Sequence, residues 1–345
     1  MPDDIYSDKN LKIFKNILTY NLNIRGEQLL IVADSGVPGH QICPALAELY
    51  GMAARELGIQ SKTMYQSVRT RGQDADSAIV KAITGLPKQS TIMVIASDRL
   101  GGFTTSAGKT FRGYAKFKEH KFTSTSSLGD LPTSELAYII DLLDIDYIDT
   151  QKKADKLKKA MDHAKELHVT TKAGTDVRYG VQGMRAISAT GVYREFGTGG
   201  NLPGAETYIA PNKKNVNGTI VIDGSSRTRK GTNLVKIPIR MEVKDGSIIK
   251  MNRSSEAVEL QETLDWATKQ SKYPWGVRRI GELGIALNKK AKLCGSIAID
   301  EKVYGTGHFA IGSNSWFGGS IYSIIHLDQV FWKPEIRADG KRLKW

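Results

Sequence analysis

The first half of the chain alternates strand-like and helix-like segments. Residues 28–34 (QLLIVAD) form a short apolar run typical of a buried strand, and residues 44–57 (PALAELYGMAAREL) carry an apolar stripe at helical spacing. The pattern repeats, with a helix predicted over 76–84 and a buried strand over 91–97. Because strands that alternate with helices form βαβ units, we expect an α/β N-terminal domain with a mostly parallel sheet.

The pattern changes near residue 167. Before this residue, helices are predicted over 11–22, 133–143 and 149–167. After it, β-prone runs broken by glycine follow at 167–181, 218–226, 233–251 and 323–331. One further helix is predicted over 255–270. The 345 residues also exceed the ~250–300 at which one core tends to split. We therefore expect an α/β domain at 1–166 and an α+β domain at 167–345.

The formal net charge of +13 is concentrated in the second half. Residues 171–345 carry 27 basic against 16 acidic side chains, whereas residues 1–170 carry 22 against 20. The basic stretches 152–159 and 341–345 lack an arginine-rich helix or interleaved aromatics, and SAGKT (106–110) lacks the upstream glycine of a phosphate loop. We expect no specific nucleic-acid partner, and the charge instead raises the question of an acidic substrate.

Cysteine content and hydropathy restrict the compartment. Cys43 and Cys294 are too few and too far apart for a secreted disulfide framework. No apolar run reaches the ~18–20 residues that cross a bilayer, and the first ten residues are too acidic for a signal peptide. These observations predict a cytoplasmic protein that does not bind membranes.

Two histidines occur in contexts that suit a metal site. In SIIHLDQVF, the two-residue period of a strand directs His326 and Asp328 to the same face. His308 lies in GTGHFAIGSN, where small neighbours leave space beside the imidazole. Imidazole and carboxylate are both ligands for divalent ions, although such pairs also form ordinary surface hydrogen bonds.

Two glutamates are the only acidic residues of their apolar segments. Glu282 lies in RRIGELGIALN and Glu206 in NLPGAETYIAP. A buried carboxylate is costly unless it is paired or binds a metal. Together with the residues above they supply three carboxylates and two imidazoles, which suffice for two divalent ions that share a bridging carboxylate.

The segments NLPGAETYIAP, RRIGELGIALN, IDEKVYGTGHFAIG and HLD, in this order, resemble the metal-binding segments of the thermophilic aminopeptidase family, also called the aminopeptidase T family. The resemblance implies an N-terminal α/β domain, a C-terminal two-metal domain, a homodimer and a peptide or small amide substrate. It makes five residues the ligands of two zinc, cobalt or manganese ions: Glu206, Glu282, His308, His326 and Asp328.

The same resemblance predicts a hydrolase mechanism. A metal-bound water attacks the scissile carbonyl, Glu282 bridges the two ions and Glu301 is the candidate general base. The chain departs from the family at Lys302, where asparagine is usual, and at Ser315, where a tyrosine is expected. The missing tyrosine concerns the stabilisation of a tetrahedral oxyanion.

A second resemblance implies a different chemistry. LHVTTKAGTD resembles a segment of the 2,5-dihydroxypyridine dioxygenases, non-haem iron enzymes that also end in H-L-D. The alternative function is therefore ring cleavage with Fe(II) held by His308, His326 and Asp328 while both glutamates turn away. A third alternative is a repurposed scaffold that acts on a dedicated peptide, for which a site blocked by Lys302 would be the sign.

Overall fold

The structure is a computed structural model that describes residues 3–104, 108 and 110–345. The chain forms two compact units: unit 1 combines Met1–Tyr147 with Gly191–Gly204, and unit 2 combines Ile148–Thr190 with Ala205–Trp345. The predicted domain boundary at residues 166 and 167 stays a prediction. The phosphate-loop-like segment 106–110 lies largely outside the described residues.

Unit 1 is built on a five-stranded parallel sheet with the strand order β2-β1-β3-β4-β8. Its strands are β1 (Leu29–Asp34), β2 (Ser61–Gln66), β3 (Thr91–Ile95), β4 (Lys121–Thr125) and β8 (Gly199–Asn201). Its helices are α1 (Asp8–Asn16), continued by a π-helical turn at Ile17–Asn21, α2 (Ile42–Glu56), α3 (Ser77–Thr84), α4 (Phe111–Phe117) and α5 (Leu136–Leu143).

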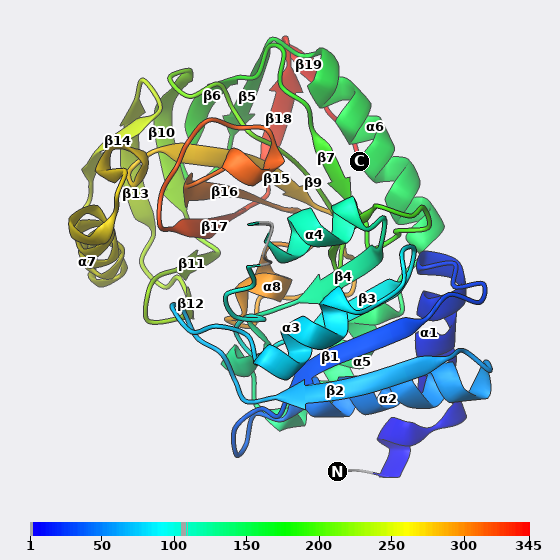
Figure 1. The fold of residues 1–345 in the computed structure, drawn as a ribbon. Coiled ribbons are helices and arrows are strands. Elements are labelled where there is room, and N and C mark those ends of the chain that lie inside the picture. Colours follow the sequence, from blue (N-terminus) through cyan, green and yellow to red (C-terminus); the bar gives the residue numbers. More distant parts are fainter. Residues whose placement is uncertain (1–2, 105–107, 109) are drawn as a thin grey trace. The chain divides into compact units, whose positions relative to one another are not determined.

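The interior strand β1 is buried along its whole length because helices cover both faces of the sheet (Figure 1). Leu30 and Val32 pack with the buried side chains of α3 and α4, among them Ile79 and Tyr114. Helix α2 contacts the same strand, and α1 packs on α2. The parallel sheet predicted from the sequence is confirmed.

Unit 2 contains two seven-stranded sheets in which the paired strands run antiparallel. The first has the order β14-β13-β10-β6-β5-β18-β19, from β5 (Glu166–Thr170), β6 (Asp176–Gly180), β10 (Val216–Ile222), β13 (Ile239–Lys244), β14 (Ser247–Met251), β18 (Glu335–Ala338) and β19 (Lys341–Arg342). The second has the order β12-β11-β17-β16-β15-β9-β7, from β7 (Ile187–Ala189), β9 (Glu206–Ile209), β11 (Ser225–Arg227), β12 (Thr232–Leu234), β15 (Ile280–Ala286), β16 (Thr306–Gly312) and β17 (His326–Trp332). Three helices accompany them: α6 (Tyr147–His163), α7 (Ser255–Gln270) and α8 (Ile297–Asp300).

One predicted helix is too long. The helix expected over 149–167 ends at His163, and β5 begins three residues later. The carboxylate of Asp339 accepts hydrogen bonds from the backbone N–H groups of Lys165 and Glu166, which removes them from the helical pattern. Leu167 is then buried in the sheet, where tertiary pairing overrides the helical periodicity. The helix predicted over 255–270 is confirmed as α7.

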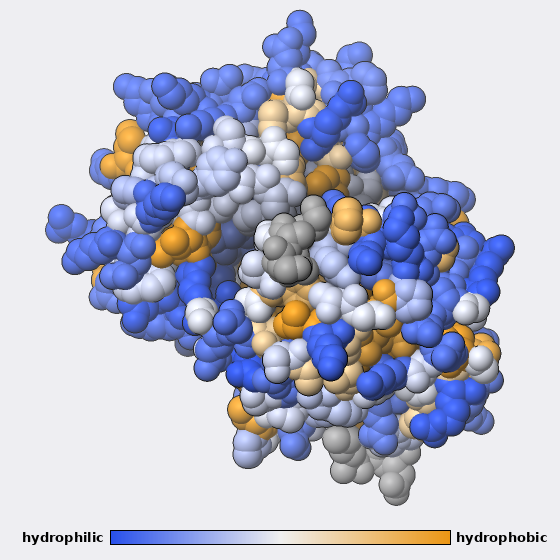
Figure 2. Space-filling view, in the orientation of Figure 1, coloured by the Kyte–Doolittle hydropathy of each residue, from blue (hydrophilic) through white to orange (hydrophobic). Residues whose placement is uncertain are grey.

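The surface drawn in Figure 2 is largely polar, and the two cysteines form no disulfide. The face in Figure 2 is mostly hydrophilic, and its apolar residues gather in small separate patches. Within the described ranges, no helix combines the length and apolar character required to traverse a bilayer. Cys43 is buried and Cys294 is partly buried, and neither forms a disulfide.

Candidate metal centre

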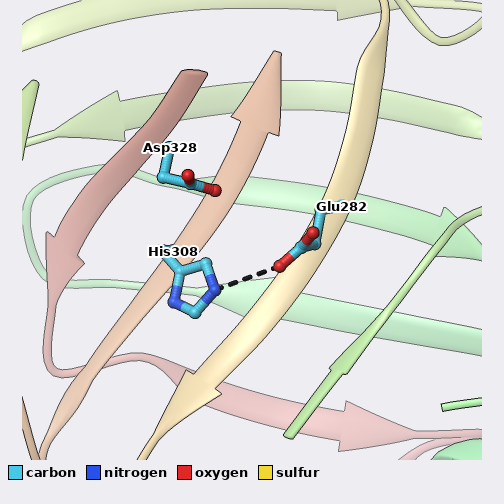
Figure 3. Close-up of side chains that lie close together, drawn as sticks. All are labelled: Glu282, His308 and Asp328. Carbon is cyan, nitrogen blue, oxygen red and sulfur yellow. Dashed lines mark hydrogen bonds and ion pairs between the residues drawn. The ribbon is translucent and has the colours of Figure 1, made fainter. Parts of the chain in front are cut away.

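Neighbouring strands of the second sheet place the predicted metal ligands on one face. The register pairs Glu282 of β15 with Ala310 of β16, and Ala310 with Asp328 of β17. Directly paired residues share a face, as do residues two apart along one strand. His308 and His326 are each two residues from this row, so four side chains project from the same face. Figure 3 shows three of them, Glu282, His308 and Asp328, converging from their strands.

The fifth predicted ligand comes from the next strand. Glu206 of β9 pairs with Ala286 of β15, which lies four residues from Glu282 and on the same face. Glu206 and Glu282 are only 3% and 5% exposed, as expected for the only acidic residues of largely apolar segments. The structure therefore brings all five predicted ligands together.

A glycine opposite His308 makes room for the imidazole. Gly284 pairs with His308 across β15 and β16, and a Cβ atom at residue 284 would lie 2.0 Å from His308 Nε2. No side chain fits at that distance, so His308 lies directly over the glycine backbone. From there its Nε2 reaches Glu282 Oε1 at 3.2 Å.

We expect Gly284→Ala to weaken metal binding by about 10- to 100-fold, the effect usual for groups that orient a ligand. The added methyl displaces the ring of His308 and leaves the other donors in place. Equilibrium dialysis against a divalent ion measures the change. Gly51→Ala is the control, because its Cβ would make an ordinary 3.6 Å contact with Thr63. Unchanged affinity in Gly284→Ala would show that His308 is not a ligand.

The donor atoms lie at distances that suit one shared cation. One atom each from Glu282, His308 and Asp328 lies within 4.8 Å of the other two. His326 Nε2 lies 3.6 Å from Glu282 Oε2 and 3.3 Å from Asp328 Oδ1. Glu206 Oε2 lies 3.4 Å from His308 Nε2. Carboxylate and imidazole donors in this proportion fit iron, zinc, cobalt or manganese.

The orientation of His326 supports a ligand role. Its Nδ1–H donates a hydrogen bond of 2.7 Å to the backbone carbonyl of Ser313, so Nε2 is the ring nitrogen that faces Glu282 and Asp328. Metal-bound histidines usually donate their second N–H in this way. The residues present therefore fit a metal ion, and their role as ligands stays a prediction.

Glu301 and Lys302 follow helix α8 and extend the cluster. Lys302 is 1% exposed, and its Nζ lies 2.7 Å from Glu206 Oε1 and forms a second ion pair with Glu301. The carboxylate of Asp300 fixes the loop before them by accepting hydrogen bonds from the backbone N–H groups of Cys294 and Gly295. The candidate base Glu301 is thus inside the cluster, but a fixed ammonium ion is its nearest charged neighbour.

Burial and mutual charge shift the pKa values in the cluster. Burial raises the pKa of Glu301 to about 8, although Lys302 opposes this. Burial lowers the pKa of both histidines, but the surrounding carboxylates outweigh it and raise the pKa of His308 to about 9 and that of His326 to about 10. The carboxylates of Glu206 and Glu301 likewise raise the pKa of Lys302 despite its burial. The acidic cluster therefore attracts positive charge strongly, which is the property that a cation site needs.

An aromatic group lies beside the cluster, and the sequence prediction missed it. The ring centroids of Trp316 and His326 lie 4.7 Å apart in an edge-to-face arrangement. The rings of Phe317 and Tyr208 contact each other in the same geometry. Trp316 is 51% exposed, so about half of the residue's surface is accessible to solvent. Only its place in the segment between His308 and His326 could have drawn attention to it.

Residues 146–343 match the protein family described as 2,5-dihydroxypyridine 5,6-dioxygenase, which is more than half of the chain. The chain belongs to this family. The 2,5-dihydroxypyridine 5,6-dioxygenase of Pseudomonas putida is 23% identical to it over 202 residues, 56% of this chain and 56% of that protein. The match thus spans little more than half the length of this curated relative.

Two solved structures share the fold of this dioxygenase-family chain. The 2,5-dihydroxypyridine dioxygenase from Pseudomonas putida has a TM-score of 0.74 at 17% identity and covers 96% of this chain and 94% of its own. AmpT from Thermus thermophilus has a TM-score of 0.65 at 16% identity and covers 97% of each chain. A parallel α/β region followed by antiparallel sheets is thus shown, as predicted. The dioxygenase resemblance is confirmed at the family level, whereas the hydrolase activity is not confirmed.

Proposed function

We propose that this chain is a dioxygenase that uses a single Fe(II) ion to cleave a dihydroxylated pyridine or a similar ring. The observation that carries this proposal is the division of the buried cluster into two parts. Glu282, His308 and Asp328 offer three donor atoms to one ion, whereas Glu206 and Glu301 are paired with the ammonium group of Lys302. The donor set differs from the one expected for iron from the sequence, because Glu282 points into the cluster instead of turning away. One metal with open coordination positions is what ring-cleaving iron chemistry requires.

The chain's own residues would bind and orient the reactants. Fe(II) at this site would supply the redox chemistry of dioxygen, which amino-acid side chains cannot provide. Ser313 fixes the ring of His326, and Gly284 gives His308 its position. Glu301, with a pKa of about 8, is suited to take a proton from a ring hydroxyl near neutral pH.

Oxygen uptake tests the proposal. The protein loaded anaerobically with Fe(II) should consume one O2 for each 2,5-dihydroxypyridine that loses its aromatic absorbance, because both oxygen atoms enter the product. Zinc-loaded protein is the control, since zinc has no redox chemistry. Oxygen uptake that does not depend on a ring substrate, or none at all with this and related dihydroxylated rings, would contradict the proposal.

A second candidate is the metal-dependent hydrolase of the aminopeptidase type. It is favoured by the inward position of Glu282, which is close to both histidines, and by the fold shared with AmpT. In this case zinc-, cobalt- or manganese-loaded protein would release the amine from aminoacyl anilides, and Fe(II) would confer no oxygen uptake.

We expect Trp316→Ala to raise KM for a ring substrate about tenfold with kcat changed less than about threefold, because stacking contributes about 0.5–1.5 kcal/mol. The half-exposed indole beside His326 is accessible to a planar ligand. Trp316→Phe should restore most of the affinity. Trp275→Ala is the control, since that half-exposed indole contacts Lys213 instead. An equal fall in kcat with KM unchanged would contradict a stacking role.

A further inference from the structure

Lys302 is a fully buried cation inside a group of carboxylates. It is 1% exposed, and lysine is rarely buried to this extent without compensation. Its Nζ is 2.7 Å from Glu206 Oε1 and is also ion-paired with Glu301. An ammonium ion held by two buried carboxylates has the coordination expected of a bound cation rather than of a surface charge.

Glu206 joins this ammonium group to the three-donor cluster. One of its oxygens faces Lys302, whereas the other lies 3.4 Å from His308 Nε2. The carboxylate therefore lies between two positively charged positions, the ammonium group and the proposed metal position. This is the placement of a carboxylate that bridges two cations, with Lys302 as one of them.

Charge balance gives the same result. Glu206, Glu282, Glu301 and Asp328 carry four formal negative charges in the buried cluster. One divalent ion and the ammonium group of Lys302 offset three of them. Without Lys302, the cluster would lose the ammonium group that is ion-paired with both Glu206 and Glu301, and a second divalent ion could offset the charge left there.

We propose that Lys302 takes the place of a second metal ion, so that the chain binds one divalent cation, and that its removal exposes a second cation site at Glu206 and Glu301. The inference rests on the proposed function only in needing an ion at Glu282, His308 and Asp328, and it does not depend on ring cleavage. Lys302 is in this sense a residue that determines metal stoichiometry.

Mn(II) binding tests this inference without any activity assay. The full chain is stripped of metal and dialysed against Mn(II), and the bound ions are counted by elemental analysis. We expect one ion in the wild type, two in Lys302→Ala, and one in Lys302→Arg, which keeps the charge. Paramagnetic resonance should show spin-coupled manganese in Lys302→Ala but not in the wild type or Lys302→Arg, because a bridging carboxylate holds the two ions close together.

Lys302→Asn is the second variant, since its amide can hydrogen-bond the freed carboxylates and leaves a smaller cavity. Two ions in either neutral variant support the inference. A second ion in the wild type overturns it, and so does the same ion count in the wild type and in both neutral variants. Failure of both neutral variants to fold in the presence of Mn(II) also overturns it. If the wild type binds no ion and the neutral variants bind one, the one-metal basis of the proposed function fails while the role of Lys302 stands.

Discussion

We expect Asp328→Asn to lower Fe(II) affinity by more than about 100-fold and to abolish turnover at sub-saturating metal. Loss of a group that only orients a ligand costs about 10- to 100-fold, so loss of a donor atom costs more. The amide keeps the volume of the side chain but removes its charge beside His326, which lies 3.3 Å away. Equilibrium dialysis and elemental analysis measure the loss.

The matched control for this variant is Asp176→Asn. Asp176 forms a His–Asp pair with His168 at 2.7 Å on strands of the same unit, but this pair is at the surface and outside the cluster. The same chemical change there should leave metal affinity and activity unaltered. If Asp328→Asn retains full affinity while its circular dichroism is native, Asp328 is not a ligand.

The second large effect concerns the stability of unit 1. Lys121 is 1% exposed and forms a buried ion pair with Glu27, and its Nζ also donates to the carbonyls of Leu22 at 2.6 Å and Asn23 at 3.0 Å. Removing one partner of a buried pair leaves an uncompensated charge. We expect Lys121→Met to lower the free energy of unfolding by about 3–5 kcal/mol, measured by urea denaturation.

The pH dependence of this loss follows from Glu27. Burial opposes its ionisation, but the hydrogen bonds from Lys121 and from the backbone N–H of Arg25, together with the charge of Lys121, outweigh burial and hold the pKa of Glu27 below its usual 4.5. Because the folded-state pKa is lowered, the stabilisation is present above that usual value and is lost as the pH falls through the folded-state pKa. The difference between wild type and Lys121→Met should therefore shrink in acid.

Lys88→Met is the control for charge removal in the same unit. The pair of Lys88 with Glu119 is exposed and 3.7 Å long, so its loss should change stability by at most about 1 kcal/mol. An equal effect of both substitutions would show that net charge, and not the buried pair, determines the result.

Local patterns in the sequence predicted much of the candidate site. The two-residue period placed His326 and Asp328 together, and the cost of burying a lone carboxylate identified Glu206 and Glu282. These arguments work because they depend on one strand or one side chain at a time. Glu301 also lies in the cluster, although its role as a base stays a prediction.

Features that depend on long-range pairing could not be predicted. The register that aligns Glu282 with Ala310 and Asp328 depends on how three successive strands pair across their connecting segments, and β15 contains an irregularity before Glu282. The need for glycine at residue 284 arises only from that register. Strand β8 has the sequence GGN, which carries no strand signal, yet it pairs with β4 of unit 1. The homodimer and the cytoplasmic location stay predictions.

The most direct test of the one-metal claim is a crystal structure of the Fe(II)-loaded protein with anomalous scattering measured at the iron edge. The account predicts one peak, at about 2.0–2.3 Å from donor atoms of Glu282, His308, His326 and Asp328, with Lys302 still paired with Glu206. Two peaks, one of them between Glu206 and Glu301 with the ammonium group displaced, would contradict the account and favour the two-metal hydrolase.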